Sequence, residues 1–211
     1  MSLVNTNWLN ENLNKVKIID CSWHMPQTKR NGFEEYNKQH IKNAIFFDLD
    51  KNSKKDTDLP HMLIDIKSWE NIVSNMGIKN DDQIIVYDNS DVISSCRCWY
   101  NFIYFGHNPN LIKVLDGGLK KWVSEKKPTT NDIVNIEPSH YSANEKIELV
   151  KNKAQINENI LTKEFLVIDA RSKERFEGLV PEPRKGLRSG SINNSYCLPF
   201  SELINADHTF I

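Results

Sequence analysis

Residues 83–88 read QIIVYD, a run of large apolar residues that closes on an aspartate. Such a run predicts a buried β-strand. The next residues, 89–91, are the turn-forming NSD, and residues 93–105 have the apolar spacing of an amphipathic helix that ends before Gly106. A strand that leads through a short loop into a helix is the building unit of α/β folds.

The same alternation of strand and helix continues on both sides of this unit. Further strands are predicted at residues 16–22, 44–47 and 112–115. Helices are predicted at residues 8–13, 33–40, 69–76 and 119–125. Strands that alternate with helices indicate an α/β domain in which helices flank a mainly parallel sheet.

The composition is that of a globular protein with a sizeable core. The 211 residues are 39% hydrophobic and 26% charged, which allows one large domain or two modest ones. A formal net charge of -1 gives no reason to expect nucleic acid or an anionic membrane surface as a partner. No apolar run is long enough to span a bilayer, and residues 1–15 lack the apolar segment of a signal peptide, so we expect a cytoplasmic location.

The four cysteines, Cys21, Cys96, Cys98 and Cys197, are scattered along the chain. Their spacing fits neither a disulfide framework nor a four-ligand zinc site, and the lone CxC at 96–98 has no second Cys or His pair nearby. We therefore expect neither a metal nor a cofactor, and we interpret the cysteines as structural thiols of a reducing compartment.

Residues 126–138, rich in Pro, Thr and Asn, are typical of a linker that closes a first domain. The pattern then starts again. Ile168-Asp169 repeats Ile19-Asp20 149 residues later, and residues 191–195 (SINNS) resemble residues 40–44 (HIKNA) 151 residues earlier. Two similar pairs in the same order at nearly one offset indicate a divergent internal duplication with a period of about 150 residues.

The duplication predicts a complete domain over residues 1–138 and a partial one over residues 139–211. With the same offset, the second-copy counterpart of Asp88 would lie near residue ~238, beyond Ile211. The second copy is therefore expected to lack the loop between its central strand and the helix after it. In the first copy, we expect Asp88 to cap that helix rather than to act in catalysis, because a carboxylate binds anions poorly and is a weak nucleophile.

Residues 175–185, RFEGLVPEPRK, carry two arginines on a segment that a glycine and two prolines keep from being helical throughout. We expect Arg175 and Arg184 to lie on this irregular loop. Arginine is suited to planar, bidentate capture of a carboxylate or a similar oxyanion. Taken alone, however, the stretch favours a solvated surface loop with two ordinary charges.

Several motifs together resemble the tandem-domain rhodanese-type sulfurtransferases over essentially the whole chain. In the first half they are Ile85-Val86-Tyr87-Asp88, Ser94, Arg97, Trp99, Phe105-Gly106-His107, residues 114–119 with Trp122, and residues 46–50 with His61-Met62-Leu63. In the second half they are Asp169-x-Arg171, Arg175-Phe176-x-Gly178, residues 181–184, Gly186 and Leu198-Pro199-Phe200. The chain departs from the family at Lys42-Asn43, usually Pro-Gly, and at Ser191, usually His. Both are turn positions, so they bear on loop geometry more than on function.

The resemblance implies two domains, each a mainly parallel sheet flanked by helices, with the active site between them. It implies a nucleophilic cysteine in the strand-to-helix loop of the second domain and places Asp88 at the inactive counterpart of that position. The thiolate would take a sulfane sulfur from a small-molecule donor, become a persulfide, and pass the sulfur on. The acceptor would be cyanide or a thiol, such as thioredoxin or a low-molecular-weight thiol. The N–H groups and the helix dipole at the loop would favour thiolate and persulfide.

Two branches of the family differ in their sulfur donor. Four positions here resemble the branch that uses 3-mercaptopyruvate and releases pyruvate. Asp50 and His61 would form a hydrogen-bonded relay with a loop serine, although either residue alone fits a solvated surface position. Arg175 and Arg184 would grip the carboxylate and carbonyl of the substrate. The thiosulfate branch commonly lacks the second arginine and the Asp/His pair.

Two alternatives stay open. One is a thiosulfate sulfurtransferase. The other is a non-catalytic rhodanese-like module, which is the better interpretation if the protein ends at Ile211.

Overall fold

The computed structural model describes residues 2–184 and 186–211. The chain forms two compact units, Met1–Ile147 and Glu148–Ile211. The boundary expected at residue 138 therefore falls inside the first unit, and the assignment of the two units as rhodanese-like copies stays a prediction. Across the residues that the structure describes, no helix has both the length and the apolar character needed to cross a membrane.

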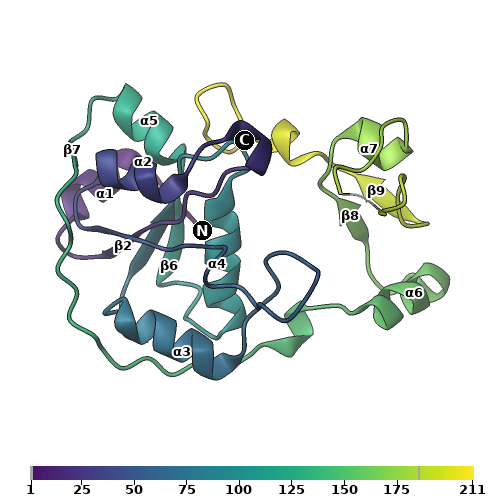
Figure 1. The fold of residues 1–211 in the computed structure, drawn as a ribbon, viewed down its shortest axis with the longest axis horizontal. Helices are drawn as coiled ribbons and strands as arrows, with labels where there is room; N and C mark the ends of the chain where they lie inside the picture. Colours follow the sequence, from purple (N-terminus) through teal and green to yellow (C-terminus); the bar gives the residue numbers. More distant parts are fainter. Residues whose placement is uncertain (1, 185) are drawn as a thin grey trace. The chain divides into compact units, whose positions relative to one another are not determined.

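A five-stranded sheet forms the centre of the first unit, with the strand order β1-β6-β5-β2-β4 (Figure 1). Every neighbouring pair in it is parallel. All four residues of the central strand β5 are buried, which confirms the QIIVYD segment as a core strand. The predicted α/β class with a mainly parallel sheet is likewise confirmed. The strands are β1 (Leu3–Val4), β2 (Lys17–Asp20), β4 (Ala44–Phe46), β5 (Ile84–Tyr87) and β6 (Ile112–Leu115).

Helices cover both faces of this sheet (Figure 1). On one face, α1 (Thr6–Asn12), α2 (Gly32–Lys38) and α5 (Gly118–Ser124) bury Leu9 and Trp122 in a cluster that also holds Ile85. α3 (Ile66–Asn75) and α4 (Ser94–Tyr104) lie against the other face. There the ring of Trp69 packs against the rings of Phe47, Phe102 and Phe105.

The segment expected to be a linker is part of the first unit. Within it, β7 (Thr129–Thr130) pairs antiparallel with β3 (His40–Ile41) to form a second, two-stranded sheet. The composition of the segment predicted only a linker, because two-residue strands leave no periodic signal. Short 3₁₀ turns complete the chain: η1 (Pro26–Thr28), η2 (Ile147–Leu149) and η3 (Phe200–Leu203).

Residues 139–147 continue this attachment through Tyr141, which is almost fully buried. Its ring stacks on His107 with centroids 6.0 Å apart, and its backbone N–H donates to Ser74 Oγ at 3.0 Å. Desolvation raises the pKa of the Tyr141 hydroxyl. Nearby, the Asn144 N–H donates to the Phe105 carbonyl at 3.0 Å. The core of the first unit therefore needs residues beyond position 138.

The second unit contains a helix, a strand, a short helix and a second strand. These are α6 (Lys153–Thr162), β8 (Val167–Asp169), α7 (Lys173–Glu177) and β9 (Ser195–Cys197). β8 and β9 are parallel, with Asp169 opposite Cys197. One expectation was wrong: Arg175 lies in α7 rather than on an irregular loop. Gly178, with a φ of 75°, ends this helix, so only the residues after it are irregular.

Candidate active site

The carboxyl ends of β2, β4 and β5 meet at one edge of the first-unit sheet, where α/β folds bind ligands. Each strand leads there into a polar segment. Ser22, Trp23 and His24 follow β2, Asp50 follows β4, and Asp88 follows β5. The two candidate residues of the first unit, Asp50 and His61, belong to this edge.

The structure brings Asp50 and His61 together. Asp50 Oδ1 lies 2.8 Å from His61 Nε2. A carboxylate only accepts hydrogen bonds, so His61 donates from Nε2 and keeps Nδ1 as its basic nitrogen. The exposed Asp50 carboxylate also accepts from the indole N–H of Trp23, Nε1 to Oδ2, at 3.0 Å. The rings of Trp23 and His61 meet edge to face, with centroids 4.8 Å apart.

The backbone of His61 is held in a left-handed conformation, with a φ of 54°. Its carbonyl oxygen accepts a hydrogen bond from Nη2 of Arg97, in α4. Partial burial lowers the pKa of the Arg97 guanidinium. Within residues 2–184 and 186–211, Nε of Arg97 is buried and has no hydrogen-bond partner.

Asp88 is committed to its own loop. Its Oδ1 accepts from the N–H of Ser90 at 2.8 Å and from the hydroxyl of Ser90 at 3.0 Å. Its Oδ2 accepts from the N–H of Ser95, in the first turn of α4, at 2.8 Å. The carboxylate therefore satisfies backbone donors that would otherwise be free to bind an anion, which is the capping arrangement expected for this aspartate.

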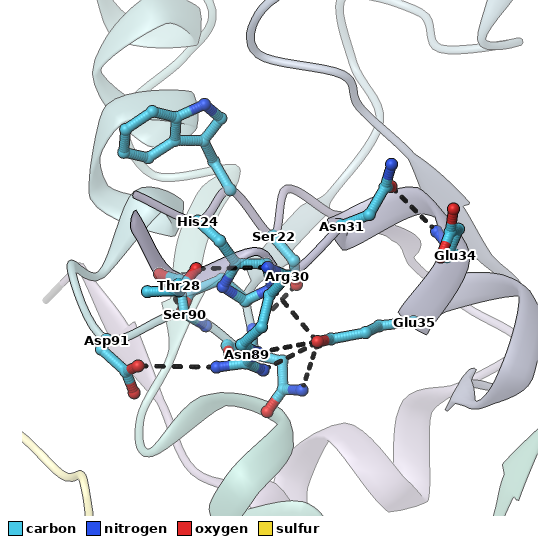
Figure 2. Close-up of polar contacts among 12 residues, drawn as sticks. Ser22, His24, Thr28, Arg30, Asn31, Glu34, Glu35, Asn89, Ser90 and Asp91 are labelled. Atoms are coloured by element: carbon cyan, nitrogen blue, oxygen red, sulfur yellow. Dashed lines mark hydrogen bonds and ion pairs between the residues drawn. The ribbon is translucent and has the colours of Figure 1, made fainter. Parts of the chain in front are cut away.

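A second polar network is centred on Glu35 of α2, close to the same edge (Figure 2). Arg30 grips both carboxylate oxygens of Glu35 at 2.7 Å, and His24 Nε2 and Asn89 Nδ2 lie 3.1 Å and 3.0 Å from Oε2. The Arg30 guanidinium lowers the pKa of Glu35. The network fastens the loop after β2 to the loop after β5. His24, Arg30 and Asp50 line one cleft of about 250 Å³ beside it.

In the second unit, Arg175 is held by Glu182. Arg175 Nη2 lies 2.5 Å from Glu182 Oε2, and Nε lies 3.3 Å from Oε1. Arg171 binds the same Glu182 at 2.7 Å and pairs with Asp169 at 2.5 Å. The Arg175 guanidinium lowers the pKa of Glu182, and the Arg171 guanidinium lowers that of Asp169. These two arginines and two carboxylates carry no net charge as a group.

Arg184 differs from Arg175 in having no such partner. It is exposed, and it makes no hydrogen bond or ion pair to another residue that the structure describes. Because the charges around Glu182 cancel, Arg184 is an uncompensated positive charge among the described residues of this loop. An exposed guanidinium on a proline-stiffened segment is available to a carboxylate ligand.

The thiols do not resemble activated nucleophiles. Burial raises the pKa of Cys96 to about 11 and also raises the pKa of Cys21. Cys98 is fully buried, and Cys197 is half-buried. A reactive cysteine needs a lowered pKa and access to solvent. In the described part of the chain, no cluster of His, Cys, Asp and Glu side chains could hold a metal ion.

Two contributors to these sites were missed from the sequence. Trp23 was not identified, since a tryptophan after a strand is ordinarily part of the core; its position between Ser22 and His24, at a strand end, was the available signal. Glu182 was noted only for its place before a proline. Its carboxylate lies seven residues after Arg175, so only the turn at Gly178 brings the two together.

Comparisons with known proteins place these sites in context. The family description "Rhodanese-like domain" matches residues 5–125. The Arabidopsis thaliana protein named "Thiosulfate/3-mercaptopyruvate sulfurtransferase 1, mitochondrial" is 37% identical over 99% of this chain, which spans 61% of that relative. The mouse protein named "3-mercaptopyruvate sulfurtransferase" is 32% identical over 96% of this chain, which spans 70% of it. The mouse "Thiosulfate sulfurtransferase" is 35% identical over 98%, and the chain spans 71% of it.

Solved structures match the chain over its whole length. The Escherichia coli SseA structure, titled as a 3-mercaptopyruvate sulfotransferase with the rhodanese fold, has a TM-score of 0.89 and 28% identity. It is matched by 100% of this chain, which covers 79% of it. The Tum1 protein of Saccharomyces cerevisiae has a TM-score of 0.88, also with 28% identity, and is covered to 74% by the whole of this chain. The chain therefore belongs to the rhodanese-like family.

Proposed function

We propose that this protein is a sulfurtransferase that takes sulfur from 3-mercaptopyruvate through a cysteine persulfide, releases pyruvate, and passes the sulfur to a thiol or to cyanide. The relatives' names support sulfur transfer but do not discriminate between donors. The mouse mercaptopyruvate and thiosulfate enzymes are 32% and 35% identical to this chain. The observation that carries the choice is the 2.8 Å hydrogen bond between Asp50 and His61.

A proton relay is useful for one donor and not for the other. With mercaptopyruvate, a thiolate attacks the substrate sulfur, an S–S bond forms, and the C–S bond breaks. The electron pair left on carbon must take a proton, so the substrate's thiol proton ends on the methyl group of pyruvate. His61, oriented by Asp50, is the group we assign to that transfer. Thiosulfate releases sulfite, which needs no proton on carbon.

The arginines are assigned to substrate binding. Arg184, with no carboxylate partner among the described residues, would hold the substrate's carboxylate. Arg175 would contribute its guanidinium while Glu182 fixes its orientation. We further propose that the nucleophilic cysteine is the second-copy counterpart of Asp88, near residue ~238 of the encoded protein. The acceptor, whether thioredoxin or a low-molecular-weight thiol, and the cytoplasmic location stay predictions.

The deciding experiment compares both donors in the protein as encoded by its gene. His61→Ala and Asp50→Asn should lower kcat for mercaptopyruvate by about 100-fold and leave thiosulfate turnover within about twofold. Equal losses with both donors would reject the assigned proton transfer. The 211-residue chain alone should release no sulfide from mercaptopyruvate, and turnover by it would reject the position given to the nucleophile.

A matched pair of arginine variants tests whether Arg184 binds the carboxylate of the substrate. Arg184→Ala should raise KM for mercaptopyruvate by about tenfold or more, with a smaller effect on kcat. Arg188→Ala removes another exposed arginine from the same region and should change neither constant. If the two variants behave alike, Arg184 does not bind the substrate.

Thiosulfate is the second candidate donor, favoured by the identity to the mouse thiosulfate sulfurtransferase. In that case kcat/KM would be higher for thiosulfate than for mercaptopyruvate in the unmodified protein. The Asp50 and His61 variants would then have little effect on sulfur transfer from thiosulfate.

A further inference from the structure

The carboxylate of Asp50 is exposed, and yet both of its oxygens are engaged. Its side chain retains 67% of its accessible surface. An exposed aspartate ordinarily samples several rotamers, and an exposed ion pair holds it only weakly. Here Oδ1 bonds to His61 at 2.8 Å and Oδ2 bonds to the indole N–H of Trp23 at 3.0 Å. The second bond fixes the plane of the carboxylate, which a single contact to His61 would leave free to rotate.

Trp23 is itself anchored to α4. Its backbone N–H donates to Ser94 Oγ at 3.1 Å, and that hydroxyl donates to the Cys21 carbonyl at 2.7 Å. Ser94 is buried and is the first residue of α4. The ring of Trp23 also meets the edge of the His61 ring. The indole is therefore positioned by the helix and in turn positions both members of the pair.

Arg97 acts on the backbone of His61. The φ of 54° at His61 is a conformation that non-glycine residues adopt at a cost. Nη2 of Arg97 donates to the carbonyl oxygen of this residue. Arg97 has no ion pair with any described carboxylate, and its Nε is buried without a partner. A half-buried guanidinium without a counter-ion destabilises a fold, and the Tyr100 ring, 5.7 Å from its Cζ, offsets only part of that cost.

We propose that Trp23 and Arg97 are positioning residues for the Asp50–His61 pair, Trp23 through the carboxylate and Arg97 through the His61 backbone. Arg97 lies on α4 and Trp23 is anchored to its first residue, Ser94, so one helix sets the geometry of a pair that lies on the loop between β4 and α3. The consequence for turnover rests on the proposed function. The positioning itself does not, because it can be observed in the protein without substrate.

The test uses Trp23→Phe, which keeps the aromatic ring and removes the N–H, and Arg97→Met, which removes the donor. ¹⁵N chemical shifts of the His61 ring nitrogens report which nitrogen carries the proton and what fraction of the molecules has each tautomer. We expect one dominant tautomer in the unmodified protein and averaged signals in both variants. For mercaptopyruvate, kcat should fall by about tenfold with KM within about twofold, and thiosulfate turnover should not change.

Controls separate positioning from general damage. Trp8→Phe changes another partly buried tryptophan of the first unit, and Arg188→Lys changes an arginine that also donates to a backbone carbonyl. Neither should alter the His61 signals. Arg97→Lys keeps a donor and should restore part of the unmodified signal pattern and of kcat. This variant keeps the test usable if Arg97→Met does not fold.

The outcomes are distinguishable. Unchanged His61 signals in Trp23→Phe and in Arg97→Met would overturn the positioning proposal, whatever the activity. Changed signals with unchanged mercaptopyruvate turnover would support positioning and reject the role given to the dyad in the proposed function.

Discussion

The β2–β4 pair of the first unit and the β8–β9 pair of the second share their register as well as their order. Asp20 lies opposite Phe46, and Asp169 lies opposite Cys197. In each pair, the N–H of the residue that follows the second strand donates to the carbonyl of the aspartate. Phe47 N–H donates to the Asp20 carbonyl at 2.8 Å, and Leu198 N–H donates to the Asp169 carbonyl at 3.0 Å. The predicted duplication requires this correspondence, although the duplication itself stays a prediction.

The turns before β4 and β9 also correspond. Asn43 and Asn194 both have a left-handed backbone, with φ values of 66° and 64°. Each side-chain amide donates to a carbonyl near the end of the helix that precedes the first strand of its pair: Asn43 to Leu13, after α1, at 3.1 Å, and Asn194 to Ile160, in α6, at 2.9 Å. Asparagine tolerates this conformation better than most residues. At position 43 it takes the place of the glycine that the resemblance leads one to expect.

The surroundings of the two pairs differ. Ile19 in β2 is fully buried, whereas Ile168 in β8 is 57% exposed. β2 is flanked by β4 and β5, while among the described residues β8 pairs with β9 alone. Strand pairing and turn geometry are thus the same in the buried pair of the first unit and in the largely exposed pair of the second. Short-range sequence encodes the pairing, and the number of neighbouring layers decides how much the pairing contributes to stability.

The largest expected difference between the two units comes from their cores. Ile19→Ala should lower the free energy of unfolding of the first unit by about 3 kcal/mol, through lost burial and a residual cavity. Ile168→Ala in the 211-residue chain should change stability by less than about 0.5 kcal/mol. All five tryptophans lie in the first unit, so urea titration followed by tryptophan fluorescence reports on that unit. Hydrogen exchange of the β8 amides reports on the second, and equal losses would contradict the comparison.

The equivalent aspartates should respond to pH in opposite directions. Burial raises the pKa of Asp20 from 3.8 to about 6, so the folded first unit binds more protons than the unfolded chain between these values. Its stability therefore falls as pH rises through that range. Asp20→Asn should stabilise the unit by on the order of 2 kcal/mol at pH ~8, and the gain should vanish near pH ~4. A gain that does not depend on pH would contradict this.

Asp169 provides the comparison for that experiment. Its pKa is lowered, chiefly by Arg171, so its contribution is present above the ordinary aspartate range and is lost only as pH falls through the folded value. Asp169→Asn should therefore be neutral or destabilising at pH ~8. Stabilisation at that pH would break the contrast with Asp20.

A smaller effect is expected from the residue two positions after each aspartate, which is Ser22 in the first unit and Arg171 in the second. Arg171→Ala leaves Asp169 and Glu182 without a shared partner, so the segment from Leu179 to Arg184 should exchange its amide hydrogens about threefold to tenfold faster. Lys173→Ala, which removes an exposed contact of 3.8 Å to Glu177, serves as the control. Similar exchange in both variants would show that Arg171 does not order the segment.

The smallest effect is expected at the two turn asparagines. Asn43→Gly loses two amide hydrogen bonds, one of them exposed, and Asn194→Gly loses one. Both changes relieve the left-handed backbone, so each should change stability by less than about 0.5 kcal/mol. Fluorescence-detected unfolding measures the first and hydrogen exchange of β9 measures the second. A large loss of stability in only one of the two variants would mean that the two turns are not equivalent.

The sequence predicted β2, β4, β5 and β6 because each is a short apolar run bounded by turn residues. It did not predict β1, β3 or β7, which have two residues each and leave no periodic signal. It also did not predict α6, whose polar sequence KAQINENILT lacks a clear apolar stripe. Arg175 was assigned to a loop because the prolines after Gly178 dominated the pattern, although the helix ends before them.

The candidate site was predictable in part. Asp50 and His61 were identified through motifs, but their mutual distance depends on a left-handed residue and a loop that no periodicity describes. Trp23 and Arg97 reach them through side-chain and backbone contacts between segments 27 and 36 residues apart. Such contacts are fixed by tertiary packing, so single-sequence reasoning has no rule that finds them.

The burial of Tyr141 has a practical consequence for recombining members of this family. A crossover placed by composition, at residue 138, would give the first unit a foreign side chain where Tyr141 stacks on His107. A crossover after Ile147 keeps residues 139–147 with the core that they complete. Chimeras that exchange second units should therefore inherit this nine-residue strap from the parent that supplies the sheet.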